Sequence, residues 1–412
     1  MDTDSGMISR RDLLIAAGTA LVSSCELAPA VGPVADLVAG PLAVPISSPP
    51  ESLLLNTGVN VRLEEIRPGL LARAADLGFH WLRTDVVWET VERLPGSFDF
   101  SAEKAAFDLA RSAGFEILGI LDYGHPAYTD DSSPSTSWER QRFARFARAA
   151  EENLGDSVRL WEVWNEPNHP RFWKAAPDPE DFAELVVVTA RAIWSVSPDR
   201  QVIAGGLSGV DVPFLQPVSR RLARLGRKGP IALGIHPYRD APPESLCDEL
   251  RAAGLVDEAG RARTPEGLPL WLTEWGYNRL SEDMTPIRQG ELDVRIPLVA
   301  ASLGIPISVI FELADARGAE TQENSYGLLA ARSLEPYPAG IAWQQAAALF
   351  SQIRDPAAGL EVTGERYSLR FADGVLSWQS TGEPAGCRTE GGSEHVVIGQ
   401  TEFCLTRTAG RR

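Results

Sequence analysis

Short apolar runs alternate with longer helical stretches between about residue 53 and residue 353 of this 412-residue chain. The helical stretches end where glycine or proline follows: residues 137–153 stop before Gly155, and residues 181–196 stop before Pro198. Ser101 is expected to cap the stretch that follows it. The alternation, repeated eight times, predicts an α/β fold in which helices join parallel strands.

Eight strand–helix units within about 300 residues predict a closed (β/α)8 TIM barrel. A doubly wound open sheet is the alternative, but no GxGxxG motif follows the first strand. Polar residues also recur at the C-terminal ends of several strands, which is where barrels carry their functional sites. The expected strands are residues 55–61, 80–85, 116–121, 158–164, 201–204, 231–235, 270–274 and 307–312.

The C-terminal part of the chain changes character after the barrel. We expect the barrel at residues 53–355 and a small β-rich segment at residues 356–412, because residues 365–371 alternate in polarity and a turn signal, Ala-Asp-Gly, follows. Cys387 and Cys404 can pair in this segment if the protein is exported. Cys247 is then expected to be a buried, free thiol.

The N-terminal 25 residues have the features of an export signal. Arg10 and Arg11 precede an apolar run, residues 13–22, that is too short to span a bilayer comfortably. The segment resembles a twin-arginine signal, although Leu13 stands where that motif usually has Phe, so an ordinary secretory signal is the alternative. We expect an exported protein that is periplasmic, extracellular or anchored at the cell surface.

The end of this segment, Val-Ser-Ser-Cys at residues 22–25, resembles a lipoprotein cleavage box. It predicts a lipid anchor on Cys25, with cleavage nearby and an unmodified Cys25 as the alternative. Residues 26–52, rich in Pro, Ala, Val, Gly and Ser, have the composition of a linker.

Charge and metal-ligand spacing exclude two kinds of partner. The formal net charge is −17, whereas nucleic-acid binding needs clustered Lys and Arg, so no nucleic acid is expected. No CxxC pair occurs, and the five His lack ligand spacing, so no metal site is expected. A neutral substrate such as a sugar is compatible with this charge.

Two apolar strands end in a carboxylate. Residues 160–168 read Leu-Trp-Glu-Val-Trp-Asn-Glu-Pro-Asn and place Glu166 after strand four; residues 270–277 read Leu-Trp-Leu-Thr-Glu-Trp-Gly-Tyr and place Glu274 at the end of strand seven. Strands four and seven lie on opposite sides of the barrel mouth, so the two carboxylates can face each other across a sugar. Glycoside cleavage needs such a pair. Glu162, which faces away from its strand neighbours, is expected to be structural.

These two strand ends, Trp-Asn-Glu-Pro at residues 164–167 and Thr-Glu-Trp-Gly at residues 273–276, resemble glycoside hydrolase clan A, the TIM-barrel retaining glycosidases. The run at residues 161–168 is similar to family 39 and related polysaccharide hydrolases. The resemblance implies a retaining hydrolase of β-linked oligo- or polysaccharides, with Glu166 as acid/base, Glu274 as nucleophile and no cofactor.

The same resemblance implies substrate-binding residues around that pair. Arg83 would lie near the nucleophile, and Asn165 would contact the sugar 2-hydroxyl. His236 would line the same subsite, and Tyr238 would donate a hydrogen bond to Glu274. Trp275 is expected to offer its ring as a platform for the apolar face of a sugar.

Strand eight departs from the clan pattern. Many members carry a Trp there, whereas this chain has Phe311 and Glu312. Glu312 could bind a substrate hydroxyl or pair with a neighbour, which leaves the sugar open. A transglycosylase with the same residues, a non-catalytic surface carbohydrate-binding protein and an exported structural lipoprotein are the alternatives; the intact Glu pair disfavours the last two. The sequence does not indicate an oligomeric state.

Overall fold

The computed structural model describes residues 52–129, 133–174, 176–225, 230–318, 321–379 and 393–407. The expected export signal, the lipid-attachment site at Cys25, the linker up to residue 51 and Cys387 lie outside these residues. Among the residues described, no helix combines the length and the apolar character needed to cross a bilayer.

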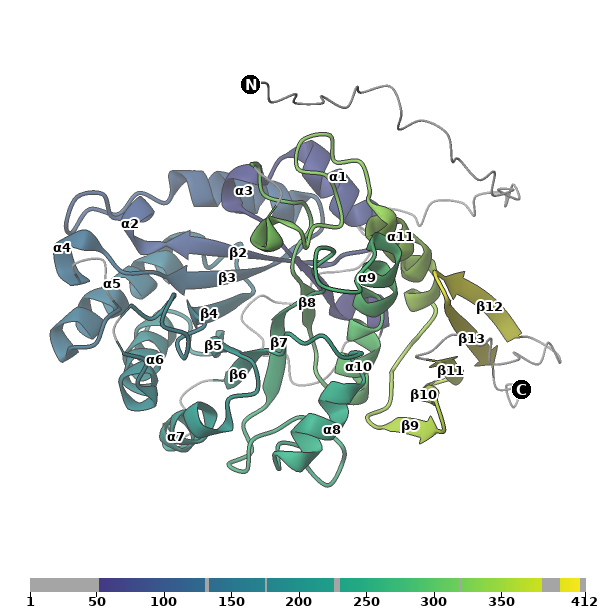
Figure 1. Ribbon diagram of the computed structural model, residues 1–412. Coiled ribbons are helices and arrows are strands. Elements are labelled where there is room, and N and C mark those ends of the chain that lie inside the picture. Colours follow the sequence, from purple (N-terminus) through teal and green to yellow (C-terminus); the bar gives the residue numbers. More distant parts are fainter. Residues whose placement is uncertain are drawn as a thin grey trace, which may run out of the picture.

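Eight parallel strands close into a barrel in chain order, with β8 pairing back to β1 (Figure 1). The expected (β/α)8 fold is confirmed, and the open doubly wound sheet is wrong. The strands are β1 (Thr57–Asn60), β2 (Trp81–Val87), β3 (Glu116–Asp122), β4 (Leu160–Asn165), β5 (Gln201–Ser208), β6 (Ile231–His236), β7 (Leu270–Trp275) and β8 (Ser308–Ile310).

Helices connect these strands and surround the barrel. They are α1 (Pro68–Asp76), α2 (Trp88–Val91), α3 (Ser101–Ser112), α4 (Pro126–Thr129), α5 (Ser137–Leu154), α6 (Pro179–Trp194), α7 (Val212–Ala223), α8 (Ser245–Ala252), α9 (Pro286–Asp293), α10 (Ile296–Ser302) and α11 (Pro338–Phe350). Short 3₁₀ helices lie at η2 (Leu53–Asn56), η3 (Leu63–Glu65) and η4 (Gln322–Asn324).

The start of α3 corrects one sequence expectation. Ser101 is the first helical residue rather than the cap, and the Asp99 carboxylate accepts its backbone N–H at 3.0 Å. An aspartate two residues earlier thus satisfies the amide, since its side chain reaches forward along the turn.

Five strands end within one residue of the expected position, whereas β2, β5 and β8 end two to four residues away from it. β5 continues past Ala204 to Ser208 because Gly205 takes a left-handed conformation, with φ 44°, and forms an irregularity in the pairing with β6. Two consecutive glycines favour a strand end in the sequence, whereas here they bend the strand without ending it. β8 ends at Ile310, because the next backbone groups of Phe311 and Glu312 bond to Trp275 and to a loop residue, Leu328.

The barrel interior is apolar below the level of the strand ends. Nine buried side chains, drawn from strands β2 to β8 and the residue before β8, form a core separate from the larger one between strands and helices. They are Trp81, Leu118, Ile120, Leu160, Ile203, Ala232, Trp271, Ile307 and Val309. Because side chains alternate along a strand, the polar residues two positions further on point into the same interior, nearer the C-terminal ends of the strands.

The C-terminal segment forms the expected β appendage, a separate antiparallel sheet in the order β12-β13-β11-β10-β9 beside the barrel (Figure 1). Its strands are β9 (Leu360–Thr363), β10 (Arg366–Phe371), β11 (Gly374–Gln379), β12 (Ser393–Ile398) and β13 (Thr401–Arg407). Cys404 is disulfide-bonded, whereas Cys247 is free and buried, as expected.

A buried polar contact joins this sheet to the barrel. The indole N–H of Trp378 on β11 donates to Glu244 Oε1 at 2.7 Å, and Arg295 Nη2 donates to Glu244 Oε2 at 3.0 Å. All three side chains are at most 2% exposed. Glu244 therefore neutralises a buried cation and satisfies a buried indole at once.

Replacing Glu244 tests how strongly the sheet depends on this contact. Glu244→Ala leaves Arg295 buried without its counter-charge and should lower the free energy of unfolding by about 3–5 kcal/mol, measured by urea titration. Glu244→Gln keeps an acceptor for Trp378 and should lose less. Equal stability of Glu244→Ala and the wild type would contradict the assignment.

Candidate active site

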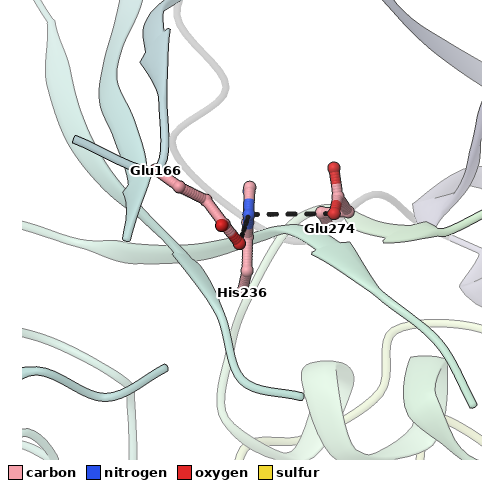
Figure 2. A group of neighbouring side chains, drawn as sticks. All are labelled: Glu166, His236 and Glu274. Carbon is pink, nitrogen blue, oxygen red and sulfur yellow. Dashed lines mark hydrogen bonds and ion pairs between the residues drawn. The ribbon is translucent and has the colours of Figure 1, made fainter. Parts of the chain in front are cut away.

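The two predicted carboxylates meet at the C-terminal end of the barrel. Glu166 directly follows β4, and Glu274 lies at the end of β7. One oxygen of each carboxylate and a ring nitrogen of His236 all lie within 4.8 Å of one another. Figure 2 shows the imidazole of His236 between the two carboxyl groups. The structure thus brings Glu166, Glu274 and His236 together.

The backbone around Glu166 is strained. Trp164 and Glu166 both take left-handed conformations, with φ of 70° and 43°. Such a conformation costs a non-glycine residue about 1–2 kcal/mol, so two of them on one strand end must be held by surrounding contacts. The N–H of Glu166 donates to the carbonyl of Gly206 at 3.0 Å, which ties this turn to β5.

Arg83, at 1% exposed, is the buried cation of the site and contacts three other strands. Its Nε donates to Glu162 Oε2 at 2.8 Å, and its Nη1 donates to Glu274 Oε2 at 2.7 Å. Nη1 also donates to Asn60 Oδ1 at 3.0 Å, and Nη2 donates to Asn165 Oδ1 at 3.1 Å. The guanidinium therefore fixes the positions of Glu274 and Asn165 together.

Glu274 is held in its ionised form. Burial by itself would raise the pKa of this carboxyl, but the charge of His236 in its protonated form, the charge of Arg83 and the hydrogen bonds from Tyr238 and Arg83 outweigh it and lower the pKa below its usual value. Tyr238 Oη donates to Glu274 Oε1 at 2.7 Å, and burial raises the pKa of this phenol, so it stays a donor.

The hydrogen bonds around His236 determine where its protons lie. Thr273 Oγ1 donates its one proton to Glu162 Oε1 at 2.8 Å, so it accepts from His236 Nε2 at 3.1 Å. Since Nε2 carries a hydrogen, the 3.2 Å contact from Nδ1 to Glu166 Oε1 contains one proton, on either side. The network therefore stores a proton next to Glu166.

This position of His236 requires a glycine on the neighbouring strand. A Cβ built on Gly206 would lie 1.8 Å from His236 Nε2, far inside the contact distance of any real side chain. Only glycine lets the imidazole pack against β5 at this point.

Glu162 is fully buried and contacts Arg83 and Thr273. It points into the barrel interior, below Glu166 and Glu274, and it orients two residues that contact Glu274 or His236. The sequence expectation of a supporting role agrees with this position.

Sequence reasoning missed two acids beside this network, Asp85 on β2 and Asp122 on β3. Burial, with the nearby Glu274 and Glu162, raises the pKa of Asp85 to about 6 against the opposing charge of Arg83. Asp122 is fully buried, and neither of its carboxylate oxygens has a hydrogen-bond partner among the described residues. Burial and then the charge of Asp85 raise its pKa well above the usual value. Asp85 lies two residues after Arg83 on β2, so the alternation of side chains along a strand could have placed it on the same face as Arg83.

Trp275 is not a sugar platform, which corrects the sequence expectation. Its side chain is fully buried, with the Arg239 guanidinium 5.4 Å from its ring centre and Tyr277 packed at 6.3 Å. Following Glu274 on the strand, it points to the opposite side, into the core between strands and helices. The position of Trp275 next to Glu274 in the sequence was therefore a misleading signal.

Two hollows open at the strand ends. One, of about 320 Å³, is lined by residues after β2 to β4, including the stacked rings of Tyr123 and Phe172, whose centres lie 6.4 Å apart. The other, of about 240 Å³, is lined by residues after β6, β7 and β8, including Tyr238 and Tyr326. Half-buried Tyr123 is therefore a better platform than the buried Trp275.

Glu312 pairs with a neighbour, one of its two expected roles. Its Oε2 accepts from Arg62 Nη2 at 2.6 Å, and the side chain is 1% exposed. Burial, opposed by the charge of Arg62, raises its pKa to about 8. This pair occupies the β1–β8 side of the barrel end.

Glu166, His236 and Glu274 are close enough to surround one metal ion. The fixed charge of Arg83, 2.7 Å from Glu274, opposes a second cation there, and Tyr238 already occupies the other oxygen of that carboxylate. The geometry therefore suits an organic substrate better than an ion.

Asp122 gives a test of the site's electrostatics. An acid whose folded-state pKa is raised binds its proton more tightly when folded, so its contribution to stability is lost as pH rises above the unfolded value of about 3.9. Asp122→Asn should therefore gain stability relative to the wild type between pH 4 and pH 7, by at most about 1.4 kcal/mol per pH unit. Urea unfolding at both pH values measures this, with exposed Asp156→Asn as control. A pH-independent difference would contradict a neutral Asp122.

Comparisons with known proteins were made at the level of sequence and fold. No family model matches the chain. It is 31% identical over 156 residues to a curated beta-xylosidase from Geobacillus stearothermophilus; the match covers 34% of this chain and only 30% of that relative.

Solved structures share the fold. A family 39 glycoside hydrolase from Bacteroides cellulosilyticus WH2 superposes with a TM-score of 0.65 at 20% identity, over 87% of this chain and 81% of the other. A family 30 endoxylanase from Clostridium papyrosolvens C71 superposes with a TM-score of 0.59 at 13% identity, over 89% and 99%. The resemblance to the TIM-barrel glycosidases of clan A is thereby confirmed: the curated relative and these structural neighbours are glycoside hydrolases, and this chain has the same eight-stranded barrel.

Proposed function

We propose that this chain is a retaining O-glycoside hydrolase that cleaves β-glycosidic bonds of an oligo- or polysaccharide. The observation that supports this proposal most directly is the pair Glu166 and Glu274, whose nearest carboxylate oxygens lie within 4.8 Å of each other. Retaining enzymes separate their carboxyl groups by roughly 5–5.5 Å, and inverting enzymes by roughly 6.5–9.5 Å to admit a water. The short separation supports retention.

In the first step, Glu274 attacks the anomeric carbon and forms a glycosyl ester. Arg83 and Tyr238 each hold one of its oxygens and keep the carboxylate ionised until it attacks. The aglycone oxygen departs with a proton from Glu166. Asn165, fixed by Arg83, is placed to contact the sugar hydroxyl next to the reacting carbon.

The proton for this step comes from the Glu166–His236 pair. Nε2 of His236 is committed to Thr273, so the shared proton can move only along the Nδ1 contact with Glu166. In the second step, Glu166 takes a proton from a water that attacks the glycosyl ester, which releases the sugar and regenerates Glu274. Both steps use residues of this chain alone.

The substrate is proposed as a saccharide with a β-linkage. The curated relative that matches part of the chain is called a beta-xylosidase, which puts β-xylosides first among the substrates to try. We also propose export, supported by the Arg10-Arg11 pair and the short apolar run that follows, with a lipid anchor on Cys25.

Leaving-group dependence tests the two roles. With a panel of aryl β-glycosides, xylosides first, Glu274→Gln should lose activity by at least about 10³-fold with every leaving group, because no glycosyl ester forms. Glu166→Gln should lose about 10²–10⁴-fold with a phenyl leaving group, but form the ester readily with 2,4-dinitrophenyl, which needs no proton. Added azide should then restore turnover, since azide attacks without a general base.

The outcome is read by product NMR and initial rates of the full chain. A first-formed product with the substrate's β-configuration supports retention, whereas the α-anomer contradicts it. Equal losses of Glu166→Gln with both leaving groups would contradict its acid role. Glycan binding by the wild type without turnover of any substrate would favour the non-catalytic binding protein.

A further inference from the structure

Trp138 differs from the other tryptophans of the chain. Ten of the eleven are buried, whereas Trp138 is 52% exposed. It lies in the first turn of α5, the long helix that follows β3. In a (β/α)8 barrel such a helix begins at the C-terminal ends of the strands, so Trp138 lies on the same end of the molecule as Glu166 and Glu274.

Trp138 begins a stripe of three residues along one face of α5. Arg142 and Arg145 follow at i+4 and i+7, and residues at this spacing share a helix face. The Arg142 guanidinium lies 5.1 Å from the Trp138 ring centre. With Ser137 and Gln141, the stripe lines an open hollow of about 570 Å³.

The Trp138 ring is held in place before any ligand arrives. Tyr128 packs edge-on against it, with ring centres 5.9 Å apart, and the Tyr128 hydroxyl donates to buried Glu92 at 2.7 Å. The capping box of Thr136 and Glu139 fixes the turn that carries it. A pre-positioned ring loses little conformational entropy on binding.

The stripe is basic on a chain whose net charge is −17. Arg142 and Arg145 form no ion pair with any residue in the part of the chain that the structure describes, whereas Arg140 pairs with Asp181 and Arg148 pairs with Glu152 on the same helix. Two cations without an ion-pair partner among the described residues, on a chain with a large negative net charge, attract an anion to this hollow.

We propose that Trp138, Arg142 and Arg145 form a second glycan-binding site that holds an acidic sugar residue, carboxylated or sulfated, of the polysaccharide cleaved at Glu166 and Glu274. This inference rests on the proposed hydrolase function. The Trp138 ring packs on the apolar C–H face of the sugar, and the guanidinium groups bind the acidic group with paired N–H donors. A hollow with a single apolar side chain suits one sugar residue better than a lipid surface, which binds a broad apolar face.

Calorimetric titration of the full chain carrying Glu274→Gln tests the proposal, because turnover does not consume the ligand. The probes are carboxymethyl cellulose and cellulose sulfate, both β-linked, with neutral hydroxyethyl cellulose as the matched control. At least one acidic glycan should bind, and more weakly as salt rises. Trp138→Ala and Arg142→Ala should each weaken binding about tenfold, the loss of one charge-assisted or cation–π contact.

Arg148→Ala is the control variant, because it removes the same charge from the same helix away from the hollow; it should leave the affinity unchanged. Binding of neither acidic glycan, equally tight binding of hydroxyethyl cellulose, or an equal loss of affinity in Arg148→Ala would overturn the proposal. So would capture of anionic phosphatidylglycerol vesicles with the same dependence on Trp138 and Arg142. Glycan binding that depends on both residues supports the site whether or not the wild type hydrolyses aryl glycosides.

Discussion

The contacts of the Arg83 guanidinium organise the site. A cation at 1% exposure loses its hydration, which costs several kcal/mol, and only closely placed carboxylates can offset that loss. Glu162 and Glu274 do so at 2.8 and 2.7 Å. The same contacts keep Glu274, the proposed nucleophile, ionised and aligned. Removing Arg83 would leave two buried carboxylates facing each other, so the charge that stabilises the barrel end also prepares the proposed chemistry.

The acid/base side of the site depends on backbone geometry more than on charge. Trp164 and Glu166, at the end of β4, both take left-handed conformations. His236 can then reach Glu166 only because Gly206 has no side chain. Thr273 fixes the remaining ring nitrogen. These contacts come from four different strands, which explains how a rigid barrel holds one proton between two defined atoms, His236 Nδ1 and Glu166 Oε1.

Much of this arrangement was predictable from the sequence because barrels repeat. Apolar runs that end in a carboxylate located Glu166 and Glu274, since in a closed parallel barrel all strand ends converge. Arg83 and His236 came from the resemblance to clan A. The sequence pattern did not reveal Asp122, because whether a carboxylate is buried without hydrogen-bond partners depends on how side chains pack in three dimensions. Trp275 was misjudged because adjacency in a strand means opposite faces. The continuation of β5 past Ala204 depended on pairing with β6, which compensates for two glycines that favour a strand end in isolation.

Covalent trapping tests the central claim most directly, namely that Glu274, held by Arg83 and Tyr238, is the nucleophile of a retaining glycosidase. The wild-type chain would be incubated with 2,4-dinitrophenyl 2-deoxy-2-fluoro-β-glycosides, xyloside first, and analysed by intact and peptide mass spectrometry. The 2-fluorine slows release of the ester, so retention requires one sugar per chain, attached to Glu274. A label on another carboxylate, or hydrolysis of the parent glycoside with inversion and no label, would contradict the account.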